Sequence, residues 1–313
     1  MSTAVETEVA ASLRALLAQS VDYAGLFPPT TLALETALKN HATYLRSSDA
    51  WMLSTFVLPV GKFADAAWFI SQFDQNRPLR ISALGPKTTN AIDFLEELKM
   101  AIKGMREFSG EYENVALINQ LEMPLPSDFG RETLSKIREL LGDLPVRAFW
   151  EASPEEAERT ISLLAEHNSR VNGRPFSFKL RTGGVTPDAF PNSMQVAKAL
   201  VAAAKYRVAL KFTAGLHHPI RMFRDEVNAK MHGFLNVLGA GALAMEHGWD
   251  ERQTSVMLED ENAGSFYFDD VVFGWRDCKV RSDQIEKHRQ FITSFGSCSF
   301  DEPRQDLREL KLL

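Results

Sequence analysis

Two short apolar segments of the chain each contain a lysine near their end, and a lysine in such a place can carry out carbonyl chemistry. The segment "FSFKLRTGG" (176–184) contains Lys179, and the segment "VALKFTAGLHH" (208–218) contains Lys211. Unpaired ammonium groups are costly to bury, so each lysine needs a partner or a function. Burial or a neighbouring cation lowers the pKa of a lysine toward the neutral, nucleophilic amine. Two functions stay open: one lysine forms a Schiff base, or both lysines bind an anion together with Arg181.

Further polar residues stand near the ends of other predicted strands. In a parallel barrel the strand ends meet on one face, so we expect these side chains to share a pocket with the lysines. We predict four catalytic residues: Lys179, Lys211, Glu151 and Asp22. We predict substrate contacts from Arg181, Thr182, His217, His218, Asn119 and Glu122. The site would then bind a small anionic metabolite.

Glycines follow the last three predicted strands and strengthen the case for an anion. They are Gly183 and Gly184 in "RTGG", Gly215 in "TAGLHHP", and Gly239 and Gly241 in "LGAGAL". Small residues let backbone N–H groups approach a phosphate, although glycine serves tight turns equally well. We therefore predict that these loops contribute to substrate binding.

A metal ion is the alternative to the Schiff base. Glu122 and Glu151 could bind a divalent ion, with His217 or His218 as nitrogen ligands, but no HxH or HExxH spacing indicates zinc. We expect no cofactor, with a divalent metal ion as the alternative. No base next to Cys298 in "FGSCSF" is evident from the sequence, so ordinary packing is expected for that thiol.

Short apolar runs alternate with amphipathic segments along the chain, which is typical of a parallel α/β fold. We predict an α/β fold of the (β/α)8 TIM-barrel type; an open doubly wound sheet would call for an early glycine fingerprint, which "VDYAGLFPPT" lacks. The predicted strands span residues 21–27, 52–58, 80–84, 114–119, 146–150, 176–181, 208–213 and 234–238. We expect a single domain, with the barrel in residues 1–260 and a C-terminal extension in 261–313 packed on it.

Composition narrows the class of protein. The 313 residues are 45% hydrophobic and carry a formal net charge of −6, which argues against a nucleic-acid-binding protein. The first residues resemble neither a signal peptide nor a membrane span, and there are only two cysteines. We expect a cytoplasmic protein that binds neither nucleic acid nor membrane. The sequence leaves the oligomeric state open, a homo-oligomer included.

The order of these motifs resembles that of the deoxyribose-phosphate aldolases, which are class I (Schiff-base) aldolases. The similar segments are "VDYAGLFPPT", "FVLP", "RISALG", "VRAFWEAS", "FKLRTGG", "VALKFTAGL" and "LNVLGAGAL". The resemblance implies that Lys179 is the Schiff-base lysine, that Lys211 lowers its pKa, and that the glycine loops face a phosphate. Where the family has an aspartate on its fourth strand, "NVALINQLE" has Val115 or Ala116, with Glu122 only later.

Three functions follow from the residues and the resemblance. The first is an aldolase-like lyase that acts on a small anionic carbonyl compound, such as a sugar phosphate. The second is a metal-dependent lyase or isomerase that uses Glu122, Glu151 and a histidine. The third is a barrel that binds an anionic metabolite without catalysis.

Overall fold

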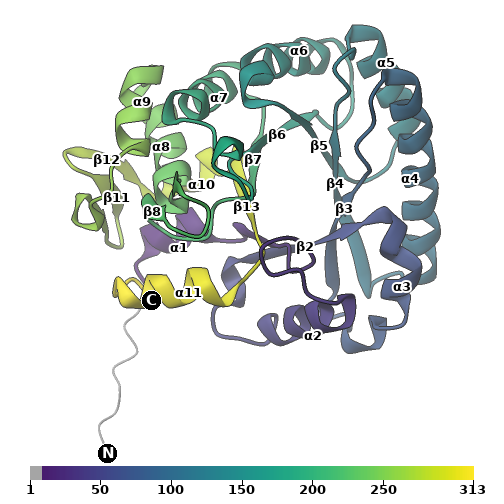
Figure 1. Cartoon of the computed structure of the whole chain (residues 1–313), viewed down its shortest axis with the longest axis horizontal. Coiled ribbons are helices and arrows are strands. Elements are labelled where there is room, and N and C mark those ends of the chain that lie inside the picture. Colours follow the sequence, from purple (N-terminus) through teal and green to yellow (C-terminus); the bar gives the residue numbers. More distant parts are fainter. Residues whose placement is uncertain (1–8) are drawn as a thin grey trace, which may run out of the picture.

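The chain forms a closed barrel of eight parallel strands, as the computed structural model of residues 9–313 shows (Figure 1). The strands, in their order around the barrel, are β1 (Val21–Tyr23), β13 (Ile292–Ser297), β7 (Leu210–Thr213), β6 (Ser177–Arg181), β5 (Arg147–Ala152), β4 (Ala116–Pro124), β3 (Leu79–Leu84) and β2 (Leu53–Pro59). Every neighbouring pair is parallel. The predicted TIM-barrel fold is therefore confirmed.

Helices surround the barrel and bury their apolar faces against it (Figure 1). In α4, Asn90 caps the first turn by accepting a hydrogen bond from the backbone N–H of Asp93, and Phe94, Leu98 and Met105 form the buried face. The helices are α1 (Ala11–Leu17), α2 (Leu34–Tyr44), α3 (Phe63–Ala67), α4 (Ala91–Glu111), α5 (Arg131–Leu141), α6 (Ala157–Arg170), α7 (Ser193–Tyr206), α8 (Phe234–His247), α9 (Glu251–Leu258), α10 (Ser282–His288) and α11 (Asp301–Glu309). None of them is long and apolar enough to cross a membrane.

The eighth barrel strand lies elsewhere than predicted. Residues 234–238 begin helix α8, and β13 closes the barrel between β1 and β7. The apolar run at 234–238 is equally compatible with a strand and with a helix that is buried on all sides, and α8 is such a helix. The segment 261–313 therefore supplies a barrel strand, and the barrel does not end at residue 260.

A long connection links β7 to β13 and carries several small elements. It contains the hairpin β8 (Met222–Arg224) and β9 (Ala229–Met231), helices α8, α9 and α10, and a three-stranded antiparallel sheet. That sheet consists of β10 (Phe266–Phe268), β11 (Val272–Trp275) and β12 (Cys278–Arg281), and it lies outside the barrel (Figure 1).

Helix α11 follows β13 and is fixed to the N-terminal part of the chain. The hydroxyl of Tyr44 donates a hydrogen bond to Asp301 over 2.7 Å, and Arg304 and Arg308 both pair with the buried Asp49. The last helix thus packs against the segment around α2.

Candidate active site

Strand register brings the two lysines together inside the barrel. Lys179 of β6 pairs in register with Lys211 of β7, and Glu151 of β5 pairs with Lys179 on its other side. The two lysine side chains are 4% and 1% exposed, so both belong to the interior. Burial at this level requires that each ammonium group has partners of opposite charge.

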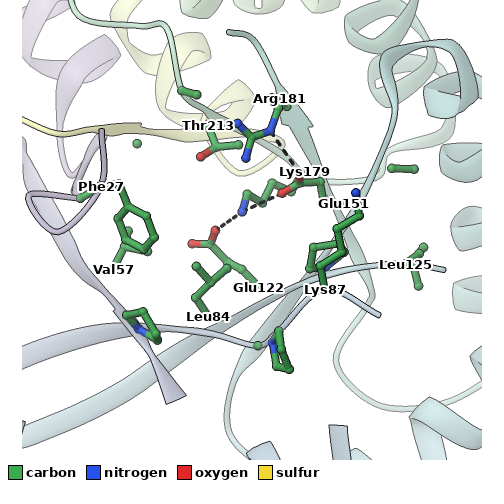
Figure 2. A pocket seen from close by; sticks show the side chains of 18 of the residues that line it. Phe27, Val57, Leu84, Lys87, Glu122, Leu125, Glu151, Lys179, Arg181 and Thr213 are labelled. Atoms are coloured by element: carbon green, nitrogen blue, oxygen red, sulfur yellow. Dashed lines mark ion pairs between the residues drawn. The ribbon is translucent and has the colours of Figure 1, made fainter. Parts of the chain in front are cut away.

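Lys179 lies between two carboxylates. Its Nζ is 2.8 Å from Oε2 of Glu122 and 2.9 Å from Oε2 of Glu151 (Figure 2). Burial opposes the charge on this amine, but the two carboxylates outweigh burial and raise the pKa of Lys179 to about 12. Lys179 is therefore an ammonium group at neutral pH.

Lys211 lies deeper and has a complete set of partners. Its Nζ is 2.9 Å from Oδ2 of Asp22, 2.5 Å from Oε1 of Glu122 and 2.7 Å from Oε1 of Gln120. An ammonium group has three donors, and here each one has an acceptor. Asp22 in turn accepts hydrogen bonds from Thr55, over 2.7 Å, and Ser294, over 2.5 Å.

Glu122 connects the two lysines, because one of its oxygens contacts Lys179 and the other contacts Lys211. Burial alone would raise the pKa of Glu122, but the two ammonium groups outweigh it and hold the pKa well below its usual range. The expectation that Lys211 lowers the pKa of Lys179 is therefore wrong. A negative charge lies between the two cations and stabilises both.

Arg181 completes an ionic cluster whose charges balance. Its Nε is 3.5 Å from Oε1 of Glu151, and about half of its side chain is exposed. We call Asp22, Glu122, Glu151, Lys179, Lys211 and Arg181 the ionic cluster. The cluster contains three carboxylates and three cationic side chains, so it has no large excess of positive charge that could attract an anion.

A cavity of about 1760 Å³ opens above the ionic cluster at the ends of the strands. Lys179, Glu122, Glu151 and Arg181 face it on one side, as Figure 2 shows. Its remaining wall is largely apolar and includes Phe27, Val57, Val60, Leu84, Met100, Leu125, Phe129 and Val185. Lys179 is thus accessible from the cavity, whereas Asp22 and Lys211 are not among the residues that line it.

Some of the residues predicted to bind substrate also line the cavity, whereas others do not. Those that line it are Gly184, Gly215 and His217. His218 is next to His217 but pairs with Asp306, its Nδ1 2.6 Å from Oδ2, and does not line the cavity. Thr182 is buried and donates its hydroxyl hydrogen to the backbone oxygen of Ala214 over 2.6 Å, which is a structural role.

The predicted glycines are closely packed, and two of them lie in a helix and not in a loop. A Cβ on Gly183 would lie 2.8 Å from the Cα of Gly215, so the loops after β6 and β7 touch through these two glycines. Gly215 has φ of +73°, a conformation that favours glycine. Gly239 and Gly241 lie inside α8, where Phe273 and Ile292 pack against them, so the predicted phosphate loop at 238–243 is wrong.

Asn119 is also misplaced in the prediction. The predicted fourth strand ended at this residue, but β4 continues to Pro124. Asn119 is exposed and does not line the cavity, because a register irregularity in β4 falls at this residue. Its neighbour Gln120 binds Lys211 instead.

Several functional candidates were missed from the sequence. Cys298 lies directly after β13 and lines the cavity with Lys87 and Thr213. The sequence predicted ordinary packing for Cys298, and because the eighth strand was misassigned it did not place this thiol at the carboxyl end of a barrel strand, where functional residues are expected. Ser82, which donates to Glu122 over 2.5 Å, had no signal in the sequence.

The predicted metal ligands do not form one site. Both oxygens of Glu122 contact lysine amines, whereas His217 and His218 contact Glu302 and Asp306 of α11. Within residues 9–313 no group of three or more His, Cys, Asp and Glu side chains is arranged to hold a metal ion. These side chains therefore do not form the ligand set that the alternative function, with a divalent metal ion, would need.

Comparison with models of known protein families finds no match, and comparison with curated protein sequences finds none at a significant level. The resemblance to deoxyribose-phosphate aldolases therefore stays a resemblance of short motifs. What the structure adds to it is the TIM-barrel fold.

Proposed function

We propose that this protein is an enzyme of the class I aldolase type, which forms a Schiff base between Lys179 and a small carbonyl compound. One observation carries the proposal. Lys179 is a buried lysine that faces a cavity at the catalytic end of a TIM barrel, with a carboxylate on either side of its amine.

The charges of the ionic cluster suit the iminium as well as the ammonium. Imine formation converts the ammonium group and a carbonyl compound into a protonated iminium and water, so the nitrogen keeps its positive charge. Glu122 and Glu151, which stabilise the ammonium, would stabilise the iminium in the same way. The high pKa of Lys179 slows the first attack but favours the electrophilic intermediate.

Glu151 is the better proton acceptor of the two carboxylates. Glu122 contacts two ammonium groups and the hydroxyl of Ser82, and its lowered pKa makes it a weak base. Glu151 contacts Lys179 and Arg181 and is partly exposed in the cavity. In the proposed reaction Glu151 takes a proton from Lys179, the free amine attacks the carbonyl carbon, and Glu151 passes that proton and then a second proton from the nitrogen to the carbonyl oxygen, which departs as water and leaves the iminium.

The iminium then permits cleavage of a carbon–carbon bond in a β-hydroxy carbonyl compound. The bond between the α- and β-carbons breaks, its electron pair moves to the iminium, and the proton of the β-hydroxyl passes to Glu151. The products are an enamine on Lys179 and a second carbonyl compound. Lys87, which lines the cavity outside the ionic cluster, supplies positive charge for an anionic group of the substrate.

Reductive trapping tests this function. The protein is incubated with candidate aldehydes and ketones and with cyanoborohydride, and adducts are located by peptide mass mapping. We expect a reduced adduct on Lys179 that Lys179→Arg abolishes, because arginine retains the charge without a usable amine. Lys87→Arg is the matched control in the same cavity and should leave the adduct intact. Absence of any adduct on Lys179 across the carbonyl series would refute the Schiff base.

The charged state of Lys179 also favours a second candidate, a barrel that binds an anionic metabolite without catalysis. Lys179 is positively charged at neutral pH and lines the cavity together with Lys87, which lies outside the ionic cluster, and Lys179→Arg would preserve the charge. Calorimetric titration with inorganic phosphate and small sugar phosphates separates the two candidates. Binding that persists in Lys179→Arg, with no trapped adduct in the unaltered protein, would favour the binding function.

A further inference from the structure

A cysteine and a histidine face each other in the cavity, apart from the ionic cluster. Cys298 follows β13, and His217 lies in the loop after β7, the strand that pairs with β13. Both residues line the cavity and both are largely buried. They therefore occupy the ends of two neighbouring barrel strands, where active-site residues of TIM barrels are found.

Hydrogen bonds position the thiol and the imidazole. Sγ of Cys298 is 3.7 Å from Nδ1 of His217, and the hydroxyl of Thr30 donates to the same sulfur over 3.0 Å. Nδ1 of His217 is also 3.2 Å from Oε2 of Glu302 in α11. The sulfur thus accepts a hydrogen bond from Thr30, and the same ring nitrogen of His217 lies within hydrogen-bond distance of both Cys298 and Glu302.

These contacts favour the ionic form of the pair. Burial raises the pKa of the Cys298 thiol, but hydrogen bonds from His217 and Thr30 outweigh burial and lower it. Burial opposes the charge on His217, but Cys298 and Glu302 raise its pKa to about 9. At neutral pH His217 is an imidazolium. The other titratable and charged groups near the pair are Tyr23, His218, Arg224, Asp301 and Asp306.

We propose that Cys298 and His217 form a second covalent site in this cavity, a thiolate–imidazolium pair that accepts an acyl group from an ester or thioester. The site is independent of the Schiff base at Lys179. It goes beyond the proposed aldolase-like function, because neither residue contacts the ionic cluster through a hydrogen bond or ion pair among the described residues.

The acyl transfer is balanced within the pair. The thiolate of Cys298 attacks the acyl carbon, a carbon–sulfur bond forms, and the bond from that carbon to the leaving oxygen or sulfur breaks. The electron pair of the broken bond stays on the leaving group, which takes the proton of the His217 imidazolium. A thioester on Cys298, a neutral histidine and a free alcohol or thiol remain, and no oxidant or reductant is needed.

The apolar wall above the pair suits an uncharged acyl chain. Phe27 and Pro28 line the cavity from the segment that also carries Thr30, and both come from the loop after β1. A compound with an apolar acyl group would bury that group there while its carbonyl carbon reaches the sulfur.

Acylation of the full-length protein by p-nitrophenyl acetate tests the site. We expect a burst of about one equivalent of p-nitrophenolate at pH 7 and an acetyl group on Cys298 by peptide mass mapping. Cys298→Ala should abolish both. Cys278→Ala, which removes the other thiol, should leave the burst unchanged, and the location of the acetyl group on Cys298 separates this site from the Schiff base. Acetyl groups on lysines alone, or an equal burst in Cys298→Ala, would overturn the proposal.

Iodoacetamide measures the thiolate directly, with Cys278 as the comparison within the same molecule. We expect Cys298 to be alkylated faster than Cys278 at pH 6. His217→Asn should raise the thiol pKa and so reduce the fraction of thiolate about tenfold for each pKa unit. The more basic thiolate is also more nucleophilic, which offsets part of this loss, so the expected decrease in rate is about threefold for each unit. His218→Asn is the matched control and should have no effect, since His218 pairs with Asp306.

The folding of each variant is checked by thermal unfolding. If His217→Asn does not fold, Thr30→Val removes the second hydrogen bond to the sulfur and should also slow alkylation. A Cys298 that reacts with iodoacetamide only after unfolding in urea, or at the same rate in every folded variant, would contradict the proposal.

Discussion

At the scale of single residues, Glu122 determines the electrostatics of the barrel interior. Its carboxylate lies between the amines of Lys179 and Lys211 and contributes to the raised pKa of Lys179, whereas a cationic neighbour alone would lower that pKa. The cluster therefore differs from a site in which a cationic neighbour makes a lysine nucleophilic. In the proposed function, reaction at Lys179 therefore requires the transfer of a proton to Glu151 when the carbonyl compound binds.

The two lysines should contribute unequally to stability. Lys211→Met leaves Asp22, which is fully buried, without a cation, and we expect a loss of about 3–5 kcal/mol in the free energy of unfolding. Lys179→Met leaves Glu122 with Lys211 and Glu151 with Arg181, and the expected loss is about 1–3 kcal/mol. Urea unfolding of both variants at pH 7 measures the difference. A larger loss for Lys179→Met would mean that Asp22 does not depend on Lys211.

The rate of imine formation at Lys179 should change little with pH near neutrality. The pKa of Lys179 is raised to about 12, so the amine is protonated at neutral pH, and in the proposed reaction it becomes neutral by passing its proton to Glu151 within the site. Because this transfer leaves the net protonation of the site unchanged, trapping with cyanoborohydride at pH 6.5, 7.5 and 8.5 should give similar initial rates. A rate that increases about tenfold with each pH unit would mean that the proton leaves to solvent before the carbonyl compound reacts.

The ion pairs of Lys179 with Glu122 and Glu151 stabilise the folded protein only while Lys179 is protonated, so their contribution depends on pH. Because the folded pKa of Lys179 lies above that of a free lysine, the contribution is complete below about pH 10.4 and is lost as pH rises through about 12. Lys179 therefore confers no pH-dependent stability near neutrality.

The sequence predicted most of the residues of the ionic cluster as site residues, but not which of them form ion pairs with one another. The strand-end pattern predicted that Asp22, Glu151, Lys179 and Lys211 share a pocket. The structure joins them in one ionic cluster, but only Lys179 and Glu151 line the cavity. Which acid pairs with which base depends on strand register, and register is a property of the closed barrel. Glu122 was accordingly assigned to substrate or metal, although it binds both lysines.

At the scale of elements, α8 shows how a buried helix can be mistaken for a strand. Eleven successive residues from Phe234 to Ala244 are buried, so the helix has no polar face to reveal its period. The true eighth strand, Ile292–Ser297, has only two large apolar residues, Ile292 and Phe295, because Ser294 faces Asp22 in the interior. The search for apolar runs therefore found the other seven barrel strands but missed this one, in which a polar side chain faces the interior.

The glycines of α8 provide a prediction at the same scale. A Cβ on Gly239 would lie 2.7 Å from Phe273 and 2.8 Å from Met257, so Gly239→Ala should destabilise the protein by about 1–3 kcal/mol. Gly110 of α4 has no atom within 4 Å of such a Cβ, and Gly110→Ala should stabilise by about 0.5 kcal/mol. Thermal unfolding compares the two. Equal effects would mean that α8 is not closely packed at Gly239.

At the scale of the whole molecule, the chain closes its barrel with a strand from near its C-terminus. β13 lies between β1 and β7, so the first and last parts of the described chain are joined by backbone hydrogen bonds. The other barrel strands follow one another with helices between them, whereas the connection from β7 to β13 also contains a hairpin and a three-stranded sheet. Folding therefore depends on contacts between distant parts of the sequence.

Truncation tests this dependence. A chain that ends at residue 260 lacks β13 and leaves β1 and β7 as open strand edges, with Phe295 and Ile292 missing from the core. We expect it to aggregate, or to unfold without a cooperative transition, by circular dichroism and urea titration.

A chain that ends at residue 300 is the control, because it retains all eight strands and loses only α11. Asp49 then loses Arg304 and Arg308, its partners in α11, so we expect a folded protein of lower stability that still unfolds cooperatively. If the chain that ends at 260 folded as well as this control, residues 261–313 would be a separable extension after all. The barrel would then have to close by pairing β1 with β7 directly, a seven-stranded arrangement in which Asp22 loses the hydrogen bond from Ser294.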